Sequence, residues 1–95
     1  RCTSCHGSTA PKGGLTLTPA ATAYGELVGK PSEGSVCSAA GTKRVVPQDP
    51  ATSQLYLKVT NDPAKCGGKM PTTGSLTAAQ QATIRAWIEA GALND

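Results

Sequence analysis

The chain has 95 residues, 16% of them charged, and a formal net charge of +3. This length predicts one small domain, near the size at which a hydrophobic core alone gives only marginal stability. Its basic residues are scattered, which argues against nucleic acid as a partner, and no apolar run approaches the roughly 18 residues of a membrane-spanning helix.

The chain begins with the C-x-x-C-H pattern Cys2-Thr3-Ser4-Cys5-His6, and His6 is its only histidine. In this pattern two thiols one helical turn apart add to the vinyl groups of haem, and the histidine ligates the iron. The alternatives are a redox-active C-x-x-C, part of a zinc site, or a local disulfide. We expect one covalently attached haem c, held through Cys2, Cys5 and His6. Because Phe is absent and aromatic residues are 3% of the chain, a haem would also supply core volume.

The first predicted helix spans residues 19–28, with Thr18 as N-cap and Pro19 at the first helical position. Gly29 and Pro31 predict its end. Its apolar positions follow helical spacing: Ala20, Tyr24, Leu27 and Val28.

An irregular stretch follows at residues 32–47, with a short extended piece predicted from Arg44 to Val46. The second predicted helix is capped by Asp49, begins at Pro50 and stops before Asn61-Asp62-Pro63. Its predicted face consists of Thr52, Leu55, Tyr56 and Val59.

The third predicted helix begins at Thr77, where Thr77 and Gln80 form a capping-box pattern, and ends at Gly91. Its apolar stripe consists of Ile84, Trp87 and Ile88. With no strand-rich region, the predicted fold class is all-α, with about three to five helices and long loops.

Met70, the only methionine, lies in a Gly- and Pro-rich loop and not on a helix face. We predict that it is the second iron ligand beside His6; the alternative is a methionine that fills a core gap. Cys37 and Cys66 are predicted to form a disulfide, the alternative being two free thiols. Arg44 either pairs with a haem propionate or is a solvated surface arginine.

Three motifs together resemble the class I cytochrome c family: CTSCHG at 2–7, KMP at 69–71 and LTAAQQATIRAWIEAGA at 76–92. YGELV at 24–28 and VPQDPATSQL at 46–55 further resemble planctomycete-type cytochrome c modules of exported bacterial proteins. The resemblance implies a helical fold around one covalent haem, with His6 proximal and Met70 distal. The family has a helix before the haem motif, where this chain has one residue. We therefore expect residues 1–95 to be a single domain excised from a larger chain, whose last helix lacks its usual partner.

The function expected is one-electron transfer, not enzymatic catalysis. The resemblance implies redox partner proteins such as an exported metalloenzyme or a respiratory-chain component, and a monomeric module in the bacterial periplasm or outside the cell. One alternative is a haem-based ligand sensor or a peroxidase-like protein with a displaceable Met70. Another is a module in which haem is only structural.

Overall fold

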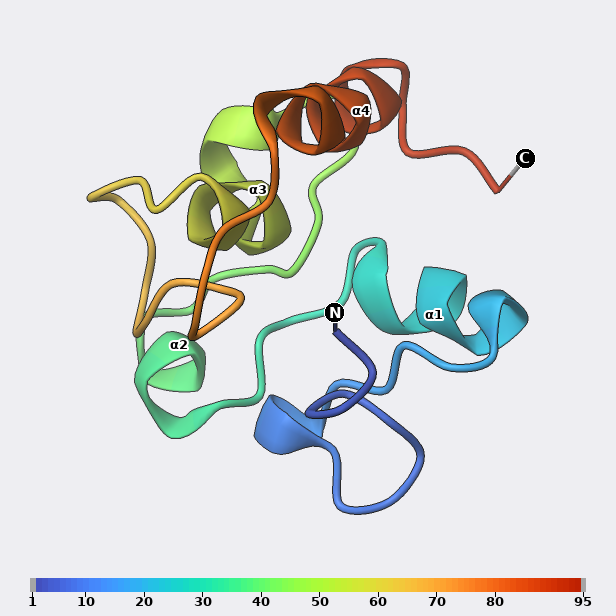
Figure 1. The fold of residues 1–95 in the computed structure, drawn as a ribbon, viewed down its shortest axis with the longest axis vertical. Helices are drawn as coiled ribbons and strands as arrows, with labels where there is room; N and C mark the ends of the chain where they lie inside the picture. Colours follow the sequence, from blue (N-terminus) through green and yellow to red (C-terminus); the bar gives the residue numbers. More distant parts are fainter. Residues whose placement is uncertain (1, 95) are drawn as a thin grey trace.

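The computed structural model describes residues 2–94, which form a small helical unit with a Cα radius of gyration of 12.2 Å (Figure 1). No strand occurs among these residues, whose extended contacts are isolated bridges. The all-α prediction is therefore confirmed at that level. The elements in chain order are η1 (Lys12–Gly14), α1 (Ala20–Leu27), α2 (Ser35–Ala39), η2 (Pro50–Thr52), α3 (Gln54–Val59) and α4 (Ala78–Glu89).

Helix α1 begins one residue later than predicted, because Pro19 and not Thr18 is its N-cap. Pro19 is extended, with ψ at 175°, and no side chain caps the helix. The Pro19 carbonyl accepts the first hydrogen bonds, from the N–H groups of Thr22 and Ala23. The predicted end is confirmed, since Gly29 has a φ of +71°, which favours a residue without a Cβ.

The second predicted helix is broken into η2 and α3 at Ser53, a residue with no exposed surface. The Ser53 hydroxyl accepts from Val46 N–H at 2.8 Å and donates to Asp49 O at 2.8 Å. Such side-chain bonds to the backbone compete with helical hydrogen bonds, and they hold Ser53 extended. Asp49 makes no capping bond with its side chain, so that part of the prediction is wrong.

Helix α4 begins with the predicted capping box. Gln80 N–H donates to Thr77 Oγ1 at 3.1 Å, and Thr77 N–H donates to Gln80 Oε1 at 2.9 Å. These reciprocal bonds satisfy two N–H groups that lack partners at a helix start. α4 ends at Glu89, close to the predicted stop at Gly91.

The core centres on Val45, Ile88 and Ala92, none of which is exposed. Val45 belongs to the extended piece predicted at 44–46, and it bridges to Val28 beside the end of α1. The apolar stripe of α4, which we expected to lack its usual partner helix, packs on this core within residues 2–94. Partly buried side chains complete the cluster: Leu27, Val28, Leu55, Tyr56, Ile84 and Trp87.

Figure 1 shows α3 and α4 side by side at one end of the molecule, in agreement with their contacts. At the other end lie α1 and the loop of the first residues, with the short helix α2 at the side. Among the helices of residues 2–94, none is both long and apolar enough to cross a bilayer.

Candidate functional site: an apolar cavity between two loops

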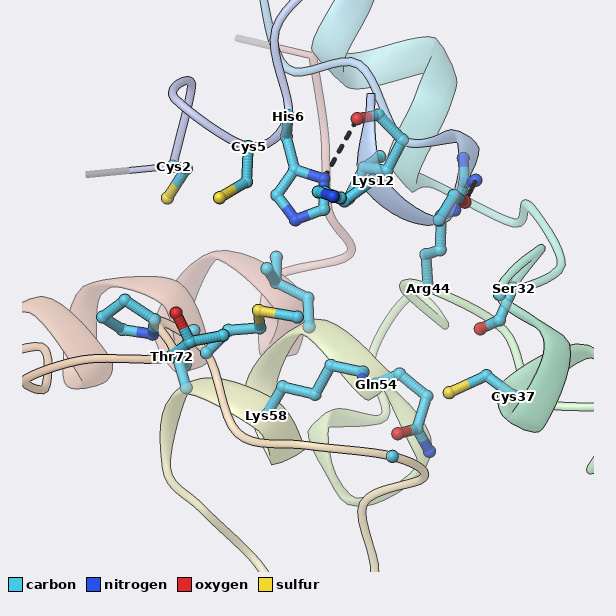
Figure 2. A pocket seen from close by; sticks show the side chains of 18 of the residues that line it. Cys2, Cys5, His6, Lys12, Ser32, Cys37, Arg44, Gln54, Lys58 and Thr72 are labelled. Atoms are coloured by element: carbon cyan, nitrogen blue, oxygen red, sulfur yellow. Dashed lines mark hydrogen bonds between the residues drawn. The ribbon is translucent and has the colours of Figure 1, made fainter. Parts of the chain in front are cut away.

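A cavity of about 490 Å³ lies between two walls. One wall is formed by residues 2–17, which we call the His6 segment. The other is formed by α3 together with residues 62–76, and we call residues 62–76 the Met70 segment. This volume falls within the range of pockets that bind small molecules. Figure 2 shows Cys2, Cys5 and His6 on one side, with Lys58 and Gln54 across from them. The lining is mainly apolar and includes Leu15, Leu17, Leu27, Leu55, Val59 and Leu76.

Every residue predicted to bind a cofactor lines this one cavity: Cys2, Cys5, His6, Arg44 and Met70. Cys37 lines it too, whereas its partner Cys66 does not. The fold therefore brings together residues that are up to 68 positions apart in the chain, from Cys2 to Met70. Their roles as ligands remain predictions.

His6 is oriented by its own loop. One backbone turn ends at His6, whose N–H donates to Cys2 O at 2.9 Å, and the His6 Nδ1 lies 3.1 Å from Leu15 O. A carbonyl oxygen can only accept, so Nδ1 carries a proton. In the neutral ring Nε2 then has a free lone pair, and Figure 2 shows the ring projecting towards the cavity.

Gly7 follows His6 because the turn leaves no room for a side chain. A Cβ at this position would lie 2.8 Å from Thr3 O, a backbone atom that cannot move aside alone. The glycine of the CTSCHG motif is thus required by the local packing of the His6 segment.

Met70 belongs to the opposite wall, where it is tied to α3. Its N–H donates to Lys58 O at 3.0 Å, and the Lys58 ammonium bonds two further carbonyls of the same segment, those of Cys66 and Gly68. Partial burial, followed by repulsion from Lys65, lowers the pKa of Lys58. Lys58 is a cavity residue that was not predicted from the sequence.

Arg44 is buried, with 6% of its surface exposed, so the alternative of a solvated surface arginine is wrong. Its guanidinium donates to Glu26 O at 2.7 Å and to Gly13 O at 3.3 Å, and it lies near the Glu26 and Glu33 carboxylates. Arg44 therefore joins the His6 segment to α1.

The predicted disulfide between Cys37 and Cys66 is confirmed, with an S–S distance of 2.01 Å. It connects α2 to the Met70 segment. The buried side chain of Gln54 also holds Cys66, because Gln54 Oε1 accepts a hydrogen bond from Cys66 N–H at 2.9 Å.

The predicted cofactor, one covalently attached haem c, is contradicted by the side chains that the structure brings together. Within residues 2–94, no group of three or more His, Cys, Asp or Glu side chains could hold a metal ion. The covalent haem c and its iron are therefore withdrawn.

The chain matches no family model, no curated protein and no solved structure. The resemblance to class I cytochromes c thus rests on its sequence motifs alone and stays a prediction.

Sequence reasoning missed three groups that shape the cavity. They are the Leu15 carbonyl, which sets the His6 ring, and the side chains of Gln54 and Lys58 on α3. A backbone acceptor has no sequence signal. The spacing of Gln54 and Lys58, four residues apart, places them on one helix face and was the one available indication.

Proposed function

We propose that this chain is an electron-transfer module whose cavity holds a flat, largely apolar, redox-active ring compound. The observation that carries the proposal is the position of His6 and Met70 in opposite walls of one apolar cavity. A flat ring between these walls would have one face towards each of them.

The charges around the cavity support a ligand that accepts an electron. Lys12 and Lys58 line it, and neither has a carboxylate partner among the described ion pairs, whereas the third basic residue, Arg44, lies beside Glu26 and Glu33. A ring that takes up an electron gains negative charge, which nearby cations stabilise, and more so where apolar walls exclude water. His6 adds an imidazole whose Nε2 can hold a proton near the reduced ring.

Electron transfer fits this arrangement better than catalysis on a second substrate. With both faces of the ring covered, only its edge would be open, which suits exchange with a redox partner protein. The disulfide supports an oxidising compartment, so we place the chain in the bacterial periplasm or outside the cell. On the motifs at 2–7, 69–71 and 76–92 we also propose a fold of the class I cytochrome c type, apart from the cofactor.

The test is a binding titration of the purified chain with a flavin, a quinone and a metal-free dicarboxylate porphyrin, each followed by its own absorbance. We expect at least one compound to bind one per chain and its reduction potential to rise on binding. His6→Ala and Met70→Ala should each weaken binding on the order of tenfold. Leu93→Ala, at an exposed residue outside the cavity, is the control. Binding by none of the compounds, or equal binding to all variants, would reject the proposal.

A further inference from the structure

Helix α3 presents two side chains, one turn apart, to residues 66–70. Gln54 accepts from Cys66 N–H at 2.9 Å, and the Lys58 ammonium donates to Cys66 O at 2.7 Å and to Gly68 O at 3.2 Å. The backbone carbonyl of Lys58 accepts from Met70 N–H at 3.0 Å. Lys58 therefore contacts the chain both before and at Met70.

The turn at Gly67 lets the Lys58 ammonium donate two hydrogen bonds, to Cys66 O and to Gly68 O. Gly67 has a φ of +69°, and a Cβ there would lie 3.3 Å from Lys58 Nζ. A residue without a side chain lets the carbonyls on either side of it turn towards one ammonium group, which has three N–H donors.

We infer that Lys58 is a positioning residue, whose ammonium holds residues 66–68 against α3 and so keeps Met70 in the cavity wall. The inference rests on the proposed function, in which Met70 contacts the bound ring. Lys58 acts through the backbone of the Met70 segment.

The disulfide alone does not account for the position of Met70. It fixes Cys66, but Gly67 and Gly68 lie between Cys66 and Lys69-Met70, and glycine has the greatest backbone freedom of any residue. The bond from Lys58 to Gly68 O is made at the second of these glycines, two residues after the disulfide-bonded Cys66. It therefore restricts the part of the segment that the cross-link leaves free.

The chain offers a specific reporter, because Met70 is its only methionine. In protein labelled with ¹³C-methyl methionine, NMR gives one methyl signal, from Met70. We compare Lys58→Gln with Lys43→Gln, which makes the same charge change at an exposed residue of another segment. For each variant the Met70 signal, the hydrogen exchange of the Cys66 and Met70 amides and the binding of the flavin, quinone and porphyrin are measured.

For Lys58→Gln we expect a shifted or broadened Met70 signal, faster exchange at the Met70 amide and binding weakened roughly tenfold, as for the loss of charged hydrogen bonds. Lys43→Gln should leave all three unchanged, and Lys58→Arg, which keeps the charge and donors, should restore part of the loss.

An unchanged Met70 signal in Lys58→Gln would overturn the inference, and so would faster exchange spread evenly over all amides. If the Met70 signal moves and binding persists, the positioning role stands and the contact of Met70 with the ring is rejected. Where Lys58→Gln does not fold, Gly67→Ala decides, because its added Cβ would lie 3.3 Å from Lys58 Nζ and should disturb both hydrogen bonds of the ammonium. An unchanged Met70 signal in Gly67→Ala would overturn the inference.

Discussion

The two walls of the cavity are held in different ways. The His6 segment is organised by its own backbone: Lys12 N–H donates to Cys5 O and Leu17 N–H to His6 O, both at 2.8 Å. Its described side-chain anchors from other segments are Arg44, through Gly13 O, and Glu26 of α1, whose Oε1 accepts from Thr16 N–H at 3.3 Å. The Met70 segment is held by a covalent cross-link and by Gln54 and Lys58 of α3.

This difference means that the two walls can be disturbed separately. Changes in α3 or in the disulfide should move Met70 and leave the His6 turn in place, because that turn is closed by local bonds. Changes at Arg44 should do the reverse. A ligand seated between the walls would then lose contact on one face at a time.

Removal of the disulfide is the change with the largest expected effect. The double variant Cys37→Ala, Cys66→Ala opens a cross-link over a separation of 29 residues. In the chain-entropy model this lowers the free energy of unfolding by roughly 3–4 kcal/mol, measurable by denaturant titration. The Met70 methyl signal should shift and the His6 ring signals should stay. The double variant Cys2→Ala, Cys5→Ala, at exposed free thiols, should change stability by about 0.5 kcal/mol or less.

Loss of the buried guanidinium at Arg44 comes next. Arg44→Gln removes the hydrogen-bond donors to Glu26 O and Gly13 O and leaves these buried acceptors without the guanidinium charge. We expect the free energy of unfolding to fall by about 2 kcal/mol. The His6 ring signals should shift while the Met70 methyl signal stays. Arg85→Gln is the matched control. The ion pair between Arg85 and Glu89 is exposed, so this variant should lower the free energy of unfolding by much less. Equal losses for both arginine variants would mean that the burial of Arg44 has no energetic consequence.

The features that the sequence predicted well depend on near neighbours. The capping box of Thr77 and Gln80 and the stop at Gly29 need only a few adjacent residues. The disulfide is the exception, because it joins residues 29 apart and was predicted from the two cysteines outside the C-x-x-C-H pattern. The features it missed depend on distant partners. Ser53 breaks the second predicted helix through its bonds to Val46 and Asp49. Helix α2 begins at Ser35, and its N-cap, Gly34, has no side chain that could have indicated a helix start.

In the candidate site, too, the parts predicted from the sequence are local patterns, and the parts missed depend on residues from other segments. The pattern from Cys2 to His6 marked one wall of the cavity correctly but led to a covalent haem c. That prediction is contradicted because residues 2–94 contain no group of three or more His, Cys, Asp or Glu side chains that could hold a metal ion. A short sequence pattern indicates which chemistry its residues permit. It does not indicate which ligand or which other side chains those residues contact in the folded chain. The opposite wall was indicated by Met70 alone, since the roles of Gln54 and Lys58 exist only when the Met70 segment folds against α3.

The tight turn of the His6 segment can be tested on its own with Gly7→Ala. The added Cβ would meet Thr3 O at 2.8 Å, so the turn must open, at a cost of about 1 kcal/mol, and the His6 ring signals should shift. Gly25→Ala in α1 is the control, because no atom lies within 4 Å of its added Cβ. There the better helix propensity of alanine should stabilise the chain by about 0.5–1 kcal/mol. If both variants gave the same gain, the turn would have room for a side chain.

The smallest effect concerns the charge on Lys58 in the Met70 wall. Burial and, secondarily, Lys65 lower its pKa from an ordinary value of 10.5, so between the lowered pKa and 10.5 the folded chain binds fewer protons than the unfolded chain. The free energy of unfolding should therefore rise with pH across this window, relative to Lys58→Gln, in urea titrations at successive pH values. The neutral amine still has N–H groups to donate, so the Met70 methyl signal should change little. A fall in relative stability instead would show that the ammonium charge stabilises the carbonyls of Cys66 and Gly68 by more than its burial costs, and the Met70 wall would then loosen as the pH rises.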